Sequence, residues 1–138
     1  MSVSVALQDL IISTLKADPK VSALVADRVY DGPPEKPTFP YISMGASDFR
    51  TDDADCINSR EETIQIDCWV RRNGRKWPCK EIVDAIVGAL RNVTGELSNG
   101  TLVGLNIELS RVLDDPDGIT THGVVQVTGF IDEEWDNG

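Results

Sequence analysis

The stretch RVLDDPDGITTHG, residues 111–123, joins two strand-like runs through a turn whose chemistry is readable from its residues. Pro116 sets φ for the first corner of a type I turn, Asp115 can accept a backbone hydrogen bond, and Gly118 can adopt the positive φ that follows. With Asp117, these residues complete the predicted structural turn. Apolar residues alternate on both sides of it, and the pattern predicts a β-hairpin; they are Leu105, Ile107 and Leu109 before the turn and Val125, Val127 and Ile131 after it.

Other periodic segments place this hairpin in a mixed fold. Apolar residues at helical spacing predict helices over residues 4–17 and 75–91, and Asp18-Pro19 opens a short helix after the first of them. Alternating residues predict further strands over 41–47 and 61–71. The predicted fold class is therefore α+β, an antiparallel sheet of about four strands with two main helices packed on one face.

The length of 138 residues suits one domain with one hydrophobic core. We expect residues 1–131 to form this domain and residues 132–138, which are acidic and end in glycine, to be a flexible tail. No run approaches the roughly 20 apolar residues that cross a bilayer. Residues 1–5 also lack the basic region of a secretory signal, so synthesis and folding in the cytoplasm, without a membrane partner, are expected.

The charge is concentrated in the second part of the chain. Residues 1–50 carry 5 basic and 6 acidic groups and residues 51–138 carry 8 and 17, which together give the net charge of −10. Such a balance opposes specific binding to a phosphate backbone. It fits a soluble surface, or one that must not adhere to nucleic acid passing near it.

The three cysteines, Cys56, Cys68 and Cys79, lack the C-x-x-C pairing of zinc and redox sites. We expect reduced thiols, with Cys68 and Cys79 packed in the core and Cys56 exposed. No cofactor is predicted.

Three aspartates, Asp52, Asp53 and Asp55, fall in a polar loop predicted over residues 48–60. They resemble a calcium loop only superficially, because the glycine and the closing glutamate of an EF-hand are missing. No metal site is predicted, and these residues are instead candidates for contact with a partner protein.

Two aromatic residues, Trp69 and Phe130, fall on the polar faces of their predicted strands. A large aromatic in such a position is either shielded by a neighbouring side chain or available to a partner. Both alternatives stay open, and both residues are candidate interface residues on the sheet face opposite the helices.

Three segments carry a family resemblance: RVYD at residues 28–31 with prolines after it, FPYI at 39–42, and RVLDDPDG at 111–118 leading to His122-Gly123. In this order, with the predicted helix between them, they resemble the small tail-completion, or tail-terminator, proteins that join head and tail in long-tailed phages and prophages. The resemblance covers essentially the whole chain and brings no catalytic residues. The loop around Asp52 and the segment after Phe130 match nothing in that pattern.

The resemblance implies a structural virion protein that caps the tail tube and joins the tail to the head, as a homo-oligomeric and specifically hexameric ring. The implied partners are other copies of the chain, the major tail tube protein and the head-tail connector protein. DNA passes through the lumen of such a ring, in the virion tail or neck. Ring closure needs two different patches on each subunit; we expect Trp69 and Phe130 in one patch and the 48–60 loop to reach a neighbour or the tube.

Two other classes of function remain open. A small hydrolase would gather His122, the single histidine, with Asp114 or Asp117, although the sequence contains no nucleophile elbow, phosphate loop or H-E-x-x-H motif. A monomeric protein-binding adaptor is the other alternative.

Overall fold

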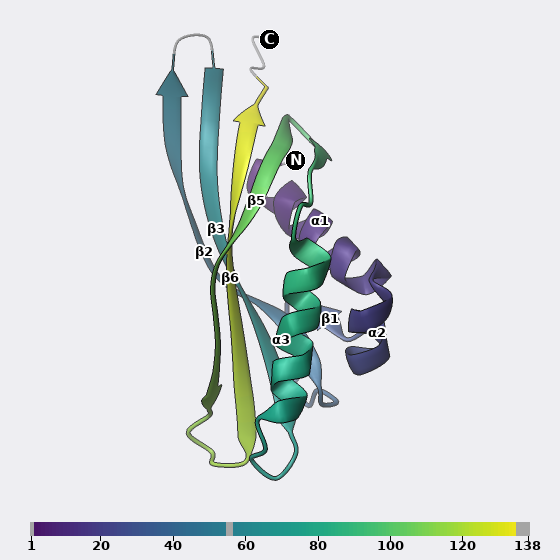
Figure 1. Cartoon of the computed structure of the whole chain (residues 1–138). Helices are drawn as coiled ribbons and strands as arrows, with labels where there is room; N and C mark the ends of the chain where they lie inside the picture. Colours follow the sequence, from purple (N-terminus) through teal and green to yellow (C-terminus); the bar gives the residue numbers. More distant parts are fainter. Residues whose placement is uncertain (1, 55–56, 135–138) are drawn as a thin grey trace.

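The computed structural model describes residues 2–54 and 57–134, which form a curled sheet with helices on one face (Figure 1). The helices are α1 (Val3–Ala17), α2 (Pro19–Val25) and α3 (Trp77–Leu90). The strands are β1 (Val29–Tyr30), β2 (Tyr41–Ala54), β3 (Ile57–Arg71), β4 (Gly95–Leu97), β5 (Gly100–Asp114) and β6 (Thr120–Glu133). Within these ranges no helix is long and apolar enough to cross a membrane.

The sheet has six strands in the order β1-β2-β3-β6-β5-β4. β1 lies parallel to β2, and every other neighbouring pair is antiparallel. The α+β class is therefore confirmed, whereas the prediction of an antiparallel sheet of about four strands is wrong, because the sheet is mixed and has two more strands. β1 and β4 are only 2 and 3 residues long, which is too short for a residue alternation to reveal them.

The helices begin within one or two residues of the predicted positions, since α1 begins at Val3 rather than at residue 4 and α3 at Trp77 rather than at residue 75. The carboxylate of Asp18 caps α2 by accepting hydrogen bonds from the amides of Lys20 at 2.9 Å and Val21 at 3.0 Å. α3 begins at Trp77 with Pro78 in its first turn, where the missing amide of proline costs no hydrogen bond.

The hairpin formed by β2 and β3 is the main departure from the sequence-based expectation. After a bulge, its register continues from the pair Ser47 and Ile64 to the pair Ala54 and Ile57. The predicted loop over residues 48–60 is therefore wrong, since strands occupy most of that range. The side chains in this range are mostly polar, so they show no alternation of apolar and polar residues that would predict a strand. Backbone hydrogen bonds can pair two strands without such an alternation. Figure 1 shows the hairpin projecting past the helices as a long, twisted ribbon.

The core lies between the helices and one face of the sheet. Strand β3 contributes the four alternating residues that the sequence predicts, Ile64, Ile66, Cys68 and Val70. Against them pack residues from all three helices and from the neighbouring strands, including Leu7, Ile11, Leu15, Val21, Val25, Ile82, Ile86, Leu90, Leu102, Val125, Val127 and Ile131.

The predicted packing role of Cys68 and Cys79 is confirmed. Both are buried, and their Sγ atoms lie 3.6 Å apart between β3 and α3. A hydrogen bond to Cys79, together with burial, raises the pKa of the Cys68 thiol well above its usual value. Cys56 lies outside the described residues.

Strand β6 continues through Glu133. Two residues of the segment expected to be a flexible tail, Asp132 and Glu133, are therefore paired in the sheet, opposite Ser59 and Asn58 of β3.

Candidate functional site

The sheet face opposite the helices, which we call the outer face, carries the candidate interface residues Trp69 and Phe130. Both alternate with core residues along their strands, so their side chains point away from the helices. Strand register aligns one residue from each of four strands into a row near the β5-β6 turn: Tyr41, Trp69, His122 and Leu113.

Stacking between aromatic side chains holds this row of residues together. The rings of Trp69 and His122 are nearly parallel, 9° apart in orientation, with centroids 3.9 Å apart. Tyr41 flanks the other side of Trp69 with a centroid separation of 6.4 Å, and the indole nitrogen of Trp69 donates a hydrogen bond to Ser43 Oγ at 3.1 Å. Trp69 is therefore half-buried and shielded by its neighbours, which was one of the two alternatives for it.

A chain of hydrogen bonds continues from the row along the outer face. His122 Nε2 lies 2.6 Å from Oδ1 of Asp67, which is buried and also accepts a hydrogen bond from Gln65 at 2.9 Å. Gln65 in turn accepts one from Gln126. Gly45 leaves the space that Asp67 needs, because a Cβ atom at position 45 would overlap Asp67 Oδ2. Asp67 belongs to no motif in the sequence, and only the pairing of Trp69 with His122 places it next to the histidine.

Phe130 lies at the other end of the outer face. It is half-buried beside a shallow polar hollow whose lining includes Asp48, Arg50 and Glu61. Phe130 lies eight positions along β6 from His122, which corresponds to about 27 Å along a strand. Trp69 and Phe130 therefore share the outer face without touching each other, and their membership of one interface patch stays a prediction.

The candidate aspartates lie toward the tip of the β2-β3 hairpin. Asp52 is exposed and pairs with Ser59 across the hairpin, and Asp53 pairs with Asn58 through its backbone. Asp55 lies outside the described residues. The role of these residues in partner contacts stays a prediction.

The turn between β5 and β6 has the predicted chemistry. The amide of Gly118 donates to the carbonyl of Asp115 at 3.0 Å, and Gly118 has a positive φ of 76°. The Asp117 carboxylate accepts hydrogen bonds from the amides of Ile119 at 2.9 Å and Thr120 at 2.8 Å, and from the Thr120 hydroxyl at 2.5 Å. The turn residues Asp115, Pro116, Asp117 and Gly118 thus close the hairpin.

The hydrogen bonds from Thr120 lower the pKa of Asp117 below its ordinary value of 3.8. A carboxylate with a depressed pKa stabilises the fold above its unfolded pKa, and this contribution is lost as the pH falls through the folded pKa. We expect Asp117→Asn to cause a small loss of stability at pH 7, and the difference from wild type to shrink below about pH 4.

Urea denaturation of both proteins at pH 7 and pH 3 measures this difference, because the titration of all other carboxyl groups is common to the two. A difference of the same size at both pH values would contradict the assigned role of the charge.

The structure does not gather His122 with the acids that a hydrolase would use. The partner of His122 is Asp67 on the outer face, whereas Asp114 forms an ion pair with Lys76 and Asp117 binds the amides of the turn. In the described ranges, no group of three or more histidine, cysteine or acidic side chains could hold a metal ion. The contacts of His122 account for it as a structural residue.

Replacing His122 with alanine is expected to lower the free energy of unfolding by about 1–3 kcal/mol, because the variant loses the stacked ring and leaves buried Asp67 with one partner fewer. His122→Phe retains the stacking and is expected to lose only part of that energy. Denaturant unfolding followed by tryptophan fluorescence measures both variants. Equal stability of the alanine variant and the wild type would show that the row contributes nothing to the fold.

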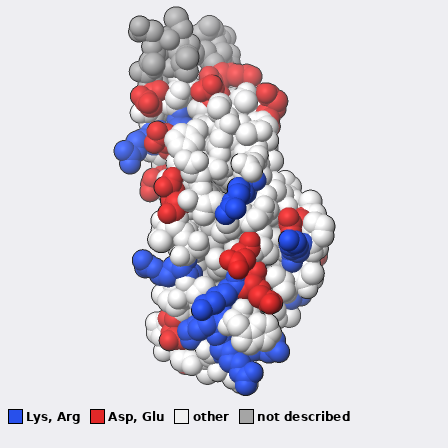
Figure 2. Space-filling model, in the orientation of Figure 1, with Lys and Arg blue, Asp and Glu red and all other residues white. Residues whose placement is uncertain are grey.

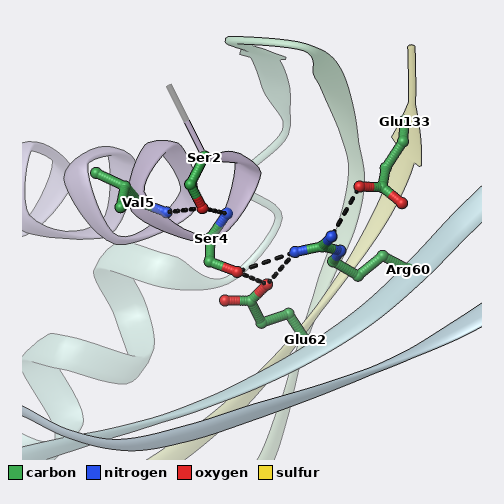
Figure 3. Close-up of polar contacts among 6 residues, drawn as sticks. All are labelled: Ser2, Ser4, Val5, Arg60, Glu62 and Glu133. Carbon is green, nitrogen blue, oxygen red and sulfur yellow. Dashed lines mark hydrogen bonds and ion pairs between the residues drawn. The ribbon is translucent and has the colours of Figure 1, made fainter. Parts of the chain in front are cut away.

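A charged cluster fastens α1 to the β2-β3 hairpin (Figure 3). Arg60 Nη2 lies 2.9 Å from a carboxylate oxygen of Glu133, and Nη1 donates to Ser4 Oγ at 3.0 Å. The Ser4 hydroxyl donates to Glu62 Oε1 at 2.7 Å, and Glu62 is only 2% exposed. The guanidinium of Arg60 also covers the ring of Phe49, with its Cζ 3.8 Å from the ring centroid. The periodicity of the sequence could not predict this cluster. Glu62 is a charged residue at a core-facing position, where the alternation would lead one to expect an apolar residue.

Charge is unevenly distributed along the molecule. In Figure 2 acidic side chains gather toward the end that carries the hairpin tip, and lysines and arginines gather toward the opposite end. The acidic end includes Asp52, Glu133 and Glu134, whereas the turn before α3 has the sequence RRNGRK over residues 71–76. The two ends therefore offer different surfaces to partners.

The helices cover one face of the sheet and leave the outer face open, and the single histidine is engaged by Asp67 and Trp69. Residues 9–132 match the family of tail completion protein gp17, and the chain belongs to that family. It is therefore a structural protein of bacteriophage tail completion, a component of the virion tail or neck.

Two of the solved structures that share the fold illustrate the similarity. A chain from the virion of a native gene transfer agent particle has a TM-score of 0.87 and 23% sequence identity, over 95% of this chain and 98% of that one. The gp17 protein of bacteriophage SPP1 has a TM-score of 0.55 and 19% identity, over 97% of this chain and 91% of its own. No curated protein sequence matches the chain.

Proposed function

We propose that the chain closes the head-proximal end of the tail tube as a ring of identical subunits, most simply a hexamer, and joins the tail to the head connector. The match to the tail completion family over residues 9–132 carries this proposal. Its partners are other copies of itself, the major tail tube protein and the connector protein. Assembly takes place in the host cytoplasm, and the ring remains in the tail or neck of the virion.

The uneven charge supports a two-ended joining role. A ring subunit that connects two different structures needs a different surface at each end, and the acidic hairpin end differs from the end with the basic RRNGRK turn. The net charge of −10 also suits a lumen through which DNA passes without specific binding.

Light scattering over a concentration series, together with electron microscopy of the protein with and without purified tail tubes, tests the ring. We expect closed rings, either in solution or at one end of the tubes. A protein that stays monomeric and leaves the tubes unoccupied would instead support the monomeric adaptor alternative.

The hydrolase alternative makes a different prediction for His122→Ala. If His122 were catalytic, this variant would fold and assemble but lose activity. We expect the His122→Ala variant to support tail joining at a temperature where it is folded. If the folded variant failed to join tails to heads, His122 would have a role beyond stabilising the fold.

A further inference from the structure

Two strands have long edges with no partner strand in the part of the chain that the structure describes. β1 pairs with β2 only at Ile42 and Ser43, which leaves residues 44–54 of β2 unpaired on that side. β4 pairs with β5 only from Gly100 to Leu102, which leaves residues 103–114 unpaired on that side. The strand order puts these two edges on opposite sides of the sheet.

Both edges are accessible. Residues 45–52 of β2 are exposed, as are most residues from 103 to 114 of β5. Large apolar side chains lie along them: Phe49 is 51% exposed on β2, and Val103 is 55% exposed on β5. Long, exposed edges with apolar side chains are unusual in a protein that stays monomeric, because they present unpaired amides and carbonyls to other strands.

The polarity of the two edges suits head-to-tail association. Three successive antiparallel pairings separate β2 from β5, so the two strands run in opposite directions. A rotation about an axis roughly along the strands preserves those directions, and β5 of one subunit then meets β2 of the next in the antiparallel sense. Pairing two different edges is the heterologous contact that closes a ring.

Self-pairing of the β2 edge is less favourable. It would bring a segment with Asp48, Arg50 and Asp52 against the same acidic segment of the other copy, and like charges on facing strands are destabilising. The β5 edge carries Arg111 with Glu108 and Asp114, so it is less acidic than the β2 edge, and it also presents exposed Leu109 and Leu113. It is therefore the better partner for the β2 edge.

We propose that residues 44–54 of β2 in one copy of the chain pair with residues 103–114 of β5 in the next copy, so that the sheets form one continuous ring. This inference rests on the proposed ring and names the surface that builds it. Within the sheet, one cross-strand row contains Asp48, Thr63, Thr128 and Asn106. In a closed ring, neighbouring subunits lie at the same height along the ring axis. Because Asp48 and Asn106 share one cross-strand row, Asn106 of one subunit then lies near the level of Asp48 of its neighbour.

Cysteine cross-linking tests the pairing. The double variant Asp48→Cys/Asn106→Cys is made in a Cys56→Ser background. After mild oxidation of the assembled protein, it is expected to give a ladder of disulfide-linked multimers. Tail tubes are added if the rings form only on them. The two positions are three strand spacings apart within one subunit, about 14 Å, which is too far for an intramolecular disulfide. Each single variant can give dimers at most. Asp48→Cys combined with Glu81→Cys, on the exposed side of α3, is the matched control and is expected to give no ladder.

The outcomes separate the edge pairing from the ring itself. Rings by electron microscopy without a ladder would overturn the edge pairing and leave the ring intact. A ladder without closed rings would support the edge pairing and contradict the ring. Absence of both, in solution and on tail tubes, would overturn both proposals.

Discussion

Replacing Arg60 with methionine is expected to lower the free energy of unfolding by about 3 kcal/mol, because it leaves the buried carboxylate of Glu62 without its charged partner. Arg60 joins two carboxylates, the Ser4 hydroxyl and the ring of Phe49 at the junction of α1 and the hairpin. Its loss therefore loosens α1 from the sheet. Chemical denaturation followed by circular dichroism measures the change.

The double variant Arg60→Met/Glu62→Leu tests the reason for that loss. Replacing both charges with apolar side chains removes the uncompensated charge, so the double variant is expected to recover much of the stability that Arg60→Met loses. Arg91→Met, at an exposed position, is the control and is expected to change stability by less than about 0.5 kcal/mol. A double variant less stable than Arg60→Met alone would contradict the account of this cluster.

Replacing Gly123 with alanine is expected to cost about 3 kcal/mol, because α3 packs directly on the backbone of β6 at this glycine. A Cβ atom at position 123 would lie 2.7 Å from Cys79 Sγ and 2.8 Å from Val83 Cγ2, and closer still to Cys68 Sγ. Such contacts force α3 away from the sheet. Thermal and urea denaturation measure the loss.

Two further variants separate this crowding from a general effect of removing a strand glycine. Gly104→Ala, where an added Cβ meets nothing within 4 Å, is the matched control and is expected to be nearly neutral. Gly123→Ala/Cys68→Ala removes the nearest clashing atom and is expected to be more stable than the sum of the single changes predicts. Strict additivity of the two changes would rule out the close contact as the cause.

The sequence predicted those parts of the fold that depend on single turn and cap residues or on the spacing of apolar residues. The Asp115 to Gly118 turn, the cap at Asp18 and the start of α3 follow from single residues whose conformational preferences are strong. Most of β3 and the core-facing stripe of α3 follow from apolar spacing.

The rest of the fold depends on contacts between distant residues. The β2-β3 hairpin forms from polar segments whose pairing is decided by backbone hydrogen bonds, and β1 and β4 are too short to have a pattern. His122 of β6 contacts Asp67 of the neighbouring strand β3, 55 positions away in the sequence, and Arg60 contacts Ser4 across 56 positions. The candidate residues Trp69 and Phe130 were placed on the right face, but only the register shows how far apart they lie.

We propose that the chain completes the tail by capping its tube, and electron microscopy of tails assembled without the chain tests this proposal most directly. In a host that produces every other virion protein, the account predicts tail tubes of uncontrolled length and full heads without attached tails. Supplying the wild-type chain in trans is expected to restore tubes of uniform length joined to heads. Tubes of normal length attached to heads in the absence of the chain would contradict the account.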